Sequence, residues 1–223
     1  MPVRQGNGHS EGGSAEERIL AAATAEFAAN GFHGARTQAI ADAAGVNKAM
    51  LHYYFRSKEN LYSRVIAAAF KRILTRVSMT WIERGPIGQR VEKVVDAYMD
   101  SYEENPALLK IVLREVVDDG NRLKRAIAGL RKEYPLNVRA PGHLLKEAGQ
   151  EFGLSQTETL HFLVNLIGMC LVSFVSPIII ESLLDFDVSD MKGFLRDRRK
   201  AIKSMVSGSL ESMKTKKGRR GKV

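Results

Sequence analysis

Cysteine is almost missing from this chain of 223 residues, which has one, Cys170, inside an apolar run. A single thiol excludes a disulfide framework and any metal site built from several thiolates. It also suits a reducing compartment, so we expect a cytoplasmic protein. The first residues, MPVRQGNGHSEGGS, lack the apolar run of a secretory signal peptide and are expected to form a disordered leader.

The usual patterns of catalytic and metal sites are missing as well. No metal-ligand spacing such as H-x-x-x-H relates the five histidines, which are His9, His33, His52, His143 and His161. The glycines of GNGHSEGG begin like a phosphate-binding G-x-G, but no predicted strand precedes them. No Walker-type G-x-x-x-x-G-K and no nucleophile elbow are present. We therefore predict no enzyme, no metal and no cofactor.

Basic charge is confined to two parts of the chain, although the net charge is +9. Residues 14–78 hold nine basic and five acidic side chains, whereas residues 79–213 hold eighteen and nineteen. The last ten residues hold six basic side chains and no acid. This distribution predicts an N-terminal module that meets a polyanion and a neutral body with another role.

Helical signals cover nearly the whole chain, and no window shows the sustained alternation of a strand. We predict an all-α fold of about nine helices. Ser14 and Glu17 form an S-x-x-E capping box at the start of the first helix, and Gly31 suits the left-handed residue that ends it.

Three further N-cap signals follow in the first third of the chain. Thr37 is expected to cap a short second helix that stops at Gly45. Asn47 is expected to cap a third helix over residues 48–55, and Ser57 a fourth that reaches about residue 81.

Five more helical segments are predicted beyond the break at residues 85–86. The fifth helix has an apolar face of Val91, Val95, Tyr98 and Tyr102 and ends near residue 105. The other segments are 107–117, 121–150 with interruptions at its prolines, 154 to a break at Pro177, and 189–213.

The second and third helices predict a helix-turn-helix. They are joined through AAGVN, a sharp turn that needs Gly45 in a left-handed conformation. The third helix then presents a mixed surface suited to a major groove, made of Lys48, Ala49, Met50, His52 and Tyr53. Tyr54 and Phe55 follow Leu51 by three and four positions, so we expect both to turn toward the core.

A wider pattern surrounds this motif: Phe27, Gly31–Phe32, Gly34, Thr37, Ile40–Ala41, Ala44–Val46, Lys48, Leu51, Tyr54–Phe55, Ser57–Lys58 and Leu61. With it, the first third of the chain resembles the TetR family of bacterial transcriptional regulators. The resemblance implies a three-helix DNA-binding domain over residues 14–60 and a helical ligand-binding and dimerisation domain over 61–213. A leader over 1–13 and a disordered basic tail over 214–223 flank them.

The resemblance also implies roles for matching residues. Thr37 and Gln38 would meet a phosphate at the start of the second helix, and Lys58 would do so from the fourth. The predicted DNA-binding residues of the third helix and its cap are Asn47, Lys48, Ala49, Met50, His52 and Tyr53. His52 stands where the family most often has a tyrosine that binds phosphate. Because Ala49 and Met50 lack polar side-chain atoms, readout would use thymine methyl groups and groove shape.

Residues 160–180 contain no Asp, Glu, Lys or Arg. That length is typical of a membrane span, but the segment includes polar residues such as His161 and Asn165, and Pro177. A helix buried between two subunits is equally apolar. In the family that this chain resembles, the corresponding helices pack against their copies in a second subunit. We therefore favour a homodimer and no membrane. The predicted interface residues are Leu163, Ile167, Leu171, Leu195, Ile202 and Val206.

The resemblance further implies a small-molecule effector in the C-terminal domain. The side chains predicted to line its pocket are Tyr98, Tyr102, Phe162, Asn165 and Met169, although such residues at helical spacing also suit a core. The predicted function is a repressor that binds a palindromic operator as a homodimer and is released by a small, largely apolar ligand. The alternative is a sequence-specific or architectural DNA-binding protein controlled by a protein partner.

Overall fold

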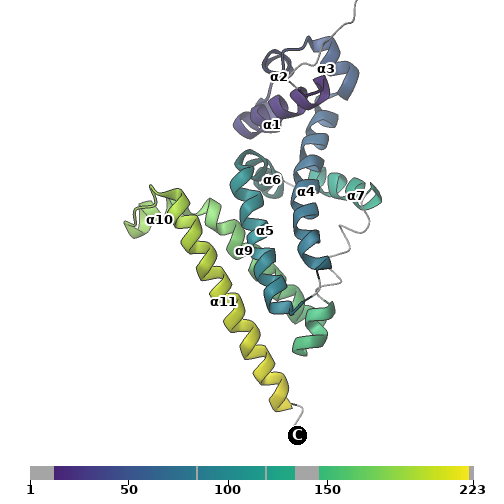
Figure 1. Cartoon of the computed structure of the whole chain (residues 1–223). Helices are drawn as coiled ribbons and strands as arrows, with labels where there is room; N and C mark the ends of the chain where they lie inside the picture. The colour runs from purple at the N-terminus through teal and green to yellow at the C-terminus, as the bar shows by residue number, and fades with distance from the viewer. Residues whose placement is uncertain (1–12, 84, 119, 134–145, 221–223) are drawn as a thin grey trace, which may run out of the picture. The chain divides into compact units, whose positions relative to one another are not determined.

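The computed structural model describes residues 13–83, 85–118, 120–133 and 146–220. Within these ranges every regular element is a helix (Figure 1), which confirms the all-α prediction. Residues 146–152 are helical. The labelled helices are α1 (Ala15–Gly34), α2 (Thr37–Ala43), α3 (Lys48–Phe55), α4 (Lys58–Ile82), α5 (Ile87–Glu104), α6 (Pro106–Asp118), α7 (Asn121–Glu133), α9 (Gln156–Val175), α10 (Pro177–Leu184) and α11 (Met191–Arg220).

The chain folds into two compact units, each made of two stretches of sequence. The first unit comprises residues 1–69 and 107–129, and the second comprises 70–106 and 130–223. A boundary at residue 60 was expected from the sequence, whereas α4 contributes to both units. Most of α6 and the first part of α7 belong to the first unit, together with the predicted DNA-binding helices.

The first unit is built on α1, whose start follows the sequence signal. The Ser14 hydroxyl accepts from the Glu17 N–H, and the Glu17 carboxylate accepts from the Ser14 N–H, which completes the capping box. Ile19, Ala23 and Phe27 have no exposed surface, because they repeat on one face of α1. Gly31 has a φ of 67° inside the last turns, as expected for the residue that ends the regular helix.

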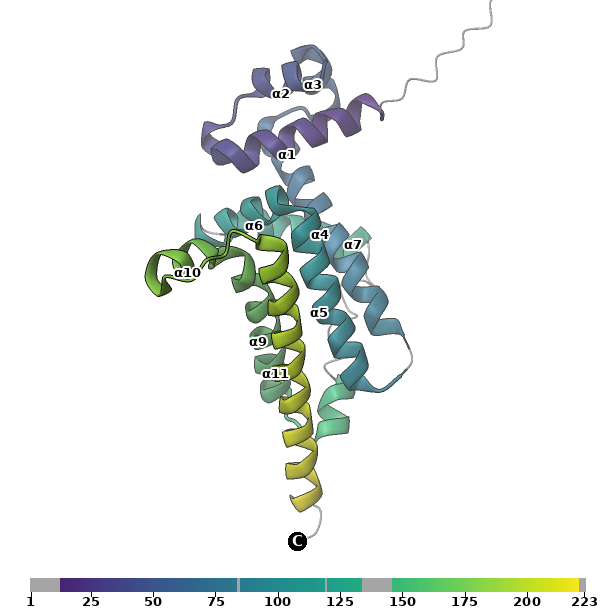
Figure 2. The same ribbon diagram turned by 60° about the vertical axis from the view of Figure 1, so that its left-hand side comes forward.

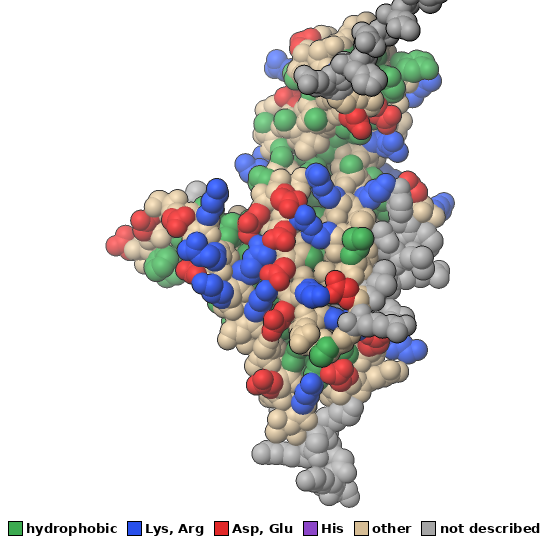
Figure 3. Space-filling view, viewed as in Figure 1, with side chains coloured by type: hydrophobic (Ala, Val, Ile, Leu, Met, Phe, Trp, Pro, Cys, Tyr) green, Lys and Arg blue, Asp and Glu red, His purple; other side chains and the backbone are tan. Residues whose placement is uncertain are grey.

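The second unit has a core formed by α5, α9 and α11, which pack against one another. All four residues of the predicted α5 face are buried. Beside this core, Arg199 of α11 binds Asp100 and Glu103 of α5 at 2.7 and 2.9 Å. Figure 3 shows the result as interleaved acidic and basic side chains over the α5–α11 surface. Charged side chains on that surface therefore pair with one another within the chain.

The C-terminal end of the chain differs from the prediction. α11 continues to Arg220, so residues 214–220, expected as part of a disordered tail, are helical. Lys214 lies 3.5 Å from the Glu151 carboxylate and 5.4 Å from the Phe152 ring centroid, and these contacts help to hold the helix there. The expected leader, except for its last residue, and the segment 134–142 lie outside the described residues.

Candidate DNA-binding surface and dimer face

The turn between α2 and α3 has the backbone geometry of a helix-turn-helix. Gly45 has a φ of 63°, which glycine adopts without a steric cost. The Val46 N–H donates to the Ala41 carbonyl at 3.0 Å and closes the turn. From α1, Arg18 Nε donates to the Ala44 carbonyl at 3.1 Å. The first helix therefore fixes the position of the turn.

The helix α3 begins where the sequence predicted. The Asn47 side-chain oxygen accepts from the Met50 N–H at 2.7 Å and satisfies one of the free donors of the first turn. Leu51 and Phe55, one turn apart, are each 4 % exposed and anchor the helix on α2 and its neighbours. The opposite side is exposed and consists of Lys48, Ala49, Met50, His52 and Tyr53. These five predicted DNA-binding residues thus share one accessible surface.

Tyr54 does not turn into the core as the sequence pattern predicts. It is 43 % exposed, and its ring packs edge-on against Tyr53 at a centroid distance of 5.5 Å. The buried stripe of so short a helix is narrow, and the pair Leu51 and Phe55 fills it. Tyr54 therefore extends the accessible aromatic surface of α3.

The start of α2 also differs in detail. Arg36, with extended backbone, occupies the N-cap position and makes no side-chain cap, while Thr37 is the first helical residue. The predicted cap at Thr37 is therefore wrong by one residue. Gln38 is exposed, and its side-chain amide donates to Asp42 at 2.8 Å. Both residues still lie at the N-terminal end of α2, where backbone N–H groups are free to meet a phosphate.

Lys58 begins α4 behind the Ser57 cap, whose hydroxyl accepts from the Asn60 N–H at 3.1 Å. The Lys58 ammonium donates to the His33 carbonyl at 3.2 Å and lies 5.1 Å from the Phe32 ring centroid. Its charge is thereby held at the C-terminal end of α1. A phosphate contact by Lys58 remains a prediction and would share this ammonium group with His33.

Arg56, between α3 and α4, is a further basic residue at this surface, and the sequence pattern does not single it out. It has a φ of 64°, which is rare for a residue with a side chain. Its guanidinium lies 5.6 Å from the ring centroid of Tyr53. The position of Arg56 follows from the backbone conformation of the turn, and hydrophobic periodicity does not predict that conformation.

A buried ion pair within the first unit was also missed. Glu115 of α6 is 1 % exposed and binds Arg122 of α7 at 3.1 Å. The Arg122 guanidinium lies 4.1 Å from the Phe32 ring centroid and 5.9 Å from that of Tyr62. Burial and the Glu115 carboxylate raise the pKa of Tyr62 well above its usual range. This cluster ties α6 and α7 to α1 and α4.

Two of the residues predicted to bind a ligand lie in an aromatic cluster of the second unit. Tyr98 and Tyr102 are 9 % and 7 % exposed, with ring centroids 6.0 Å apart. Tyr102 meets Phe174 of α9 edge-on at 5.4 Å. Burial raises the pKa of Tyr98 to about 12 and that of the nearby Cys170 thiol to about 12. The cluster is apolar and keeps these groups protonated well into the alkaline range.

The other three predicted ligand residues are more accessible. Phe162 and Met169 are half-buried, and Asn165 is exposed on α9. Asn165 therefore does not share the burial of Tyr98 and Tyr102. One cavity of about 610 Å³ opens beside the start of α9, between Lys146 and Leu160. None of the five predicted ligand residues lines it.

The predicted dimer residues fall into two groups. Leu195, Ile202 and Val206 of α11 are 6 %, 0 % and 1 % exposed within a single chain. They face the core with α5 and α9, so they leave almost no surface for a partner, and this half of the prediction disagrees with the structure. The apolar stripe of α11 was identified correctly, but its partners are helices of the same chain. Leu163, Ile167 and Leu171 of α9 are half-buried.

A different apolar surface is uncovered on α9 and was not selected from the sequence. Leu160, Val164, Val172 and Val175 are each between 44 % and 55 % exposed. They recur at helical spacing and so form one stripe along the helix. By length and composition α9 is apolar enough to cross a membrane, and 22 % of its most apolar window is buried in this chain. Figure 2 shows α9 beside α11, which together with α5 packs against its other side.

Comparisons with known proteins agree with this geometry. Residues 19–65 match the family model for bacterial regulatory proteins of the tetR family. The transcriptional repressor NicS of Pseudomonas putida is 26 % identical over 178 residues, which cover 78 % of this chain and 82 % of that protein. The regulator RutR of Escherichia coli (strain K12) is 51 % identical over 51 residues, or 23 % of this chain and 24 % of that protein.

Two further comparisons extend beyond the predicted DNA-binding domain. The regulator YdgC of Bacillus subtilis is 27 % identical over 128 residues, which cover 56 % of this chain and slightly less than two thirds, 65 %, of that protein. The structure of the fatty acid degradation regulator FadR from Bacillus halodurans has a TM-score of 0.63 at 19 % identity, and it covers 87 % of this chain and 97 % of that one. At this identity the likeness concerns the fold.

A capped and braced helix-turn-helix on an otherwise helical chain defines a DNA-binding regulator of the helix-turn-helix class. The family model, the curated relatives and the fold all agree on one group within that class. By the family model, residues 19–65 are a DNA-binding domain of the TetR family of transcriptional regulators, and the curated relatives and the fold of the chain agree with that family.

Proposed function

We propose that this regulator is a homodimeric repressor that binds a palindromic operator and leaves it when a small, largely apolar ligand binds. The observation that carries the DNA-binding part is the accessible side of α3, with Lys48, Met50 and Tyr53 exposed on a helix held by its Asn47 cap. Two relatives, NicS of Pseudomonas putida and SCO4008 of Streptomyces coelicolor, are named repressors, whereas a third, FasR of Mycolicibacterium smegmatis, is named an activator.

The uncovered stripe on α9 supports the homodimer. A stripe of large apolar side chains, each about half exposed, is costly to leave in water. In a two-fold dimer the same stripe on both copies is covered at once, because the interface is self-complementary. Two α3 helices related by that axis read two half-sites of opposite direction, which is the reason for a palindrome. A soluble dimer of this kind acts on DNA in the cytoplasm.

The route of the chain between its units supports control by a ligand. The backbone passes from one unit to the other inside α4, at the start of α6 and inside α7. A ligand in the second unit that prefers one arrangement of these helices shifts the DNA affinity by its differential affinity for the two arrangements. The aromatic cluster of Tyr98, Tyr102 and Phe174 favours an apolar ligand.

The deciding experiment is the selection of random DNA duplexes with the purified chain, followed by sequencing of the bound pool. We expect a two-fold symmetric site, and a loss of that site with Tyr53→Ala together with Lys48→Ala. Lys124→Ala removes one lysine from α7, the same change of charge, and is the control. A bound pool without symmetry would overturn the proposal of a dimer on a palindromic operator.

The ligand is tested on the selected site by adding a library of apolar small molecules. Release of the duplex by one compound supports the ligand-controlled repressor. The concentration of compound that releases the duplex should agree with the dissociation constant of that compound from the protein, measured by calorimetry. If no compound acts but a protein from the same cells releases the duplex, the alternative of control by a protein partner replaces it.

A further inference from the structure

The segment 177–190, which we name the arm, consists of α10 and the six residues that follow it. Its sequence, PIIIESLLDFDVSD, is rich in large apolar side chains. Leu183, Leu184 and Phe186 are 77 %, 71 % and 59 % exposed, and Ile179 is 52 % exposed. These are among the highest exposed fractions of large apolar residues in the described chain. The arm is therefore an apolar surface that the described residues do not cover sufficiently.

The arm extends away from the core of the second unit. α10 packs against the end of α9, and both ribbon views place it to one side of the α9–α11 pair (Figures 1 and 2). Its root is fixed, because Val188 is 3 % exposed and Asp190 accepts from the Gly193 N–H at the start of α11. The exposed leucines thus belong to an ordered projection on a firm base.

Charge on the arm is of one sign. It carries four acidic residues and no basic residue, and Figure 3 shows acidic and hydrophobic side chains together on it. The next ten residues, at the start of α11, carry five basic residues and one acid, and one of the five, Arg199, is already paired with Asp100 and Glu103 of α5. Arg196 in this part has a side chain that is 65 % exposed, and Asp197, at 3.8 Å, is on the same helix. An acidic arm of one copy therefore complements the basic start of α11 in another.

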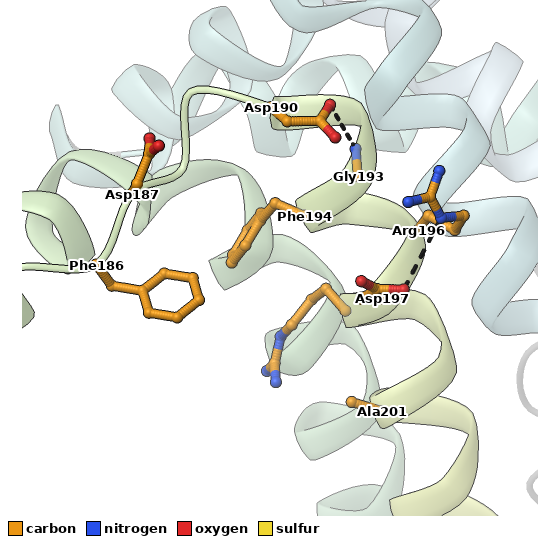
Figure 4. Close-up of a pocket in the computed structure, with 9 residues that line it drawn as sticks. Phe186, Asp187, Asp190, Gly193, Phe194, Arg196, Asp197 and Ala201 are labelled. Carbon is orange, nitrogen blue, oxygen red and sulfur yellow. Dashed lines mark hydrogen bonds and ion pairs between the residues drawn. The ribbon is translucent and has the colours of Figure 1, made fainter.

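A hollow of about 410 Å³ lies at the root of the arm, next to that basic segment. Figure 4 shows Phe186 and Phe194 facing its interior, with Ala201 at the far end on α11. Arg196, Arg198 and Asp197 supply polar groups at its walls. The hollow thus offers an apolar floor for leucine side chains, and its border carries both signs of charge, since Arg196 and Arg198 lie there with Asp187, Asp190 and Asp197.

We infer that the arm of each copy crosses onto the partner subunit and fills this hollow, with Leu183 and Leu184 as its apolar anchors. The inference rests on the homodimer proposed above and specifies a second contact for it. Two observations favour a second copy as the occupant. The exposed residues of the arm continue the uncovered α9 stripe beyond Val175, and a two-fold axis brings arm and hollow together twice, since both belong to one patch.

The first test measures dimer dissociation by sedimentation over a dilution series. Leu183→Ala with Leu184→Ala removes two exposed side chains, so folding is preserved, and we expect the dissociation constant to rise at least about 10-fold. Ser182→Ala, an exposed neighbour in the same helix, is the matched control and should leave it unchanged. An unchanged dissociation constant for the leucine variant would overturn the inference.

The second test asks whether the contact is between copies. A chain with Leu184→Cys is mixed with a tagged chain with Ala201→Cys, and a short bismaleimide is added. The native Cys170 does not interfere, because it is fully buried. We expect a covalent heterodimer from this pair and none from Leu184→Cys mixed with Ala25→Cys, an exposed position on α1.

The two proposals fail in different ways. If the unaltered chain sediments as a monomer at every concentration, the homodimer and the arm contact are both overturned. If it is a dimer that Val164→Glu dissociates, while the cysteine pair gives no covalent product, the α9 interface stands and the arm inference alone is overturned.

Discussion

Arg122 lies with its guanidinium 3.1 Å from the Glu115 carboxylate, which is almost fully shielded from water. Removal of the cation leaves a buried negative charge without compensation, and this is the costly way to break such a pair. We expect Arg122→Met to lower the free energy of unfolding by about 3 kcal/mol, measured by urea titration. The double variant Arg122→Met with Glu115→Gln should recover much of that loss.

The ion pair of Arg64 and Glu16 provides the comparison for this prediction. Its N–O distance is also 3.1 Å, but its side chains are 62 % and 40 % exposed. Arg64→Met should therefore cost less than about 0.5 kcal/mol. Equal losses for Arg122→Met and Arg64→Met would show that burial of Glu115 does not control the effect.

Arg56 is held at a φ of 64° between the two helices. Glycine reaches this conformation without its Cβ penalty, so Arg56→Gly should raise the free energy of unfolding by about 1 kcal/mol. Arg56→Ala keeps the Cβ atom and removes the same charge, so it separates the backbone effect from the electrostatic one. If both variants unfold at the same urea concentration, the strain at this residue is negligible.

Lys48 is exposed at the first position of α3, where it suits a contact with DNA. We expect Lys48→Ala to weaken binding to the selected duplex and to reduce the slope of log affinity against log salt by about 1 for each phosphate that the variant no longer neutralises. Fluorescence anisotropy at several salt concentrations measures both quantities. Lys124→Ala, an equal change of charge on α7, should leave the slope as it is.

Alkaline pH should destabilise the second unit through Cys170 and Tyr98. Their pKa values are about 12 in the folded chain, against ordinary values of 9.0 and 10.0. The unfolded chain therefore binds fewer protons once the pH exceeds 9.0. The stabilisation is complete below that pH and is lost as the pH rises toward 12.

The free energy of unfolding, measured by urea titration at half-unit steps between about pH 8 and pH 11, tests this dependence. With Cys170→Ala the decline should begin about one unit later, near the ordinary value of 10.0 for tyrosine. A decline that begins at the same pH in both chains would assign it to groups other than the thiol.

Local signals in the sequence were sufficient to predict most helix starts and the turn in the predicted DNA-binding domain. The capping box at Ser14, the Asn47 cap and the left-handed Gly45 each depend on a few neighbouring residues, and the structure has all three. The error at Thr37 is of the same local kind, because Arg36 and Thr37 differ only in which of them takes extended backbone.

Partners of helices were harder to predict. The stripe of Leu195, Ile202 and Val206 shows that α11 has an apolar face, but periodicity does not say which helix covers it. The same limit applies to Glu115, since its burial depends on Arg122 in another helix. The sequence did not indicate which side of α9 is uncovered, because the segment has no charged residues and its apolar residues occupy every face.

The discontinuous first unit restricts how this regulator can be taken apart. Its N-terminal stretch is completed by residues 107–129, whose Ile111 and Glu115 are buried and whose Arg114 donates to the Phe27 carbonyl of α1. A fragment cut after α4 would lack these interactions and expose the faces that they cover. Exchange of DNA specificity between relatives would therefore require both segments of the first unit to be transplanted together. We expect substitutions on the accessible side of α3, in contrast, to alter the recognised sequence without disturbing the packing between those segments.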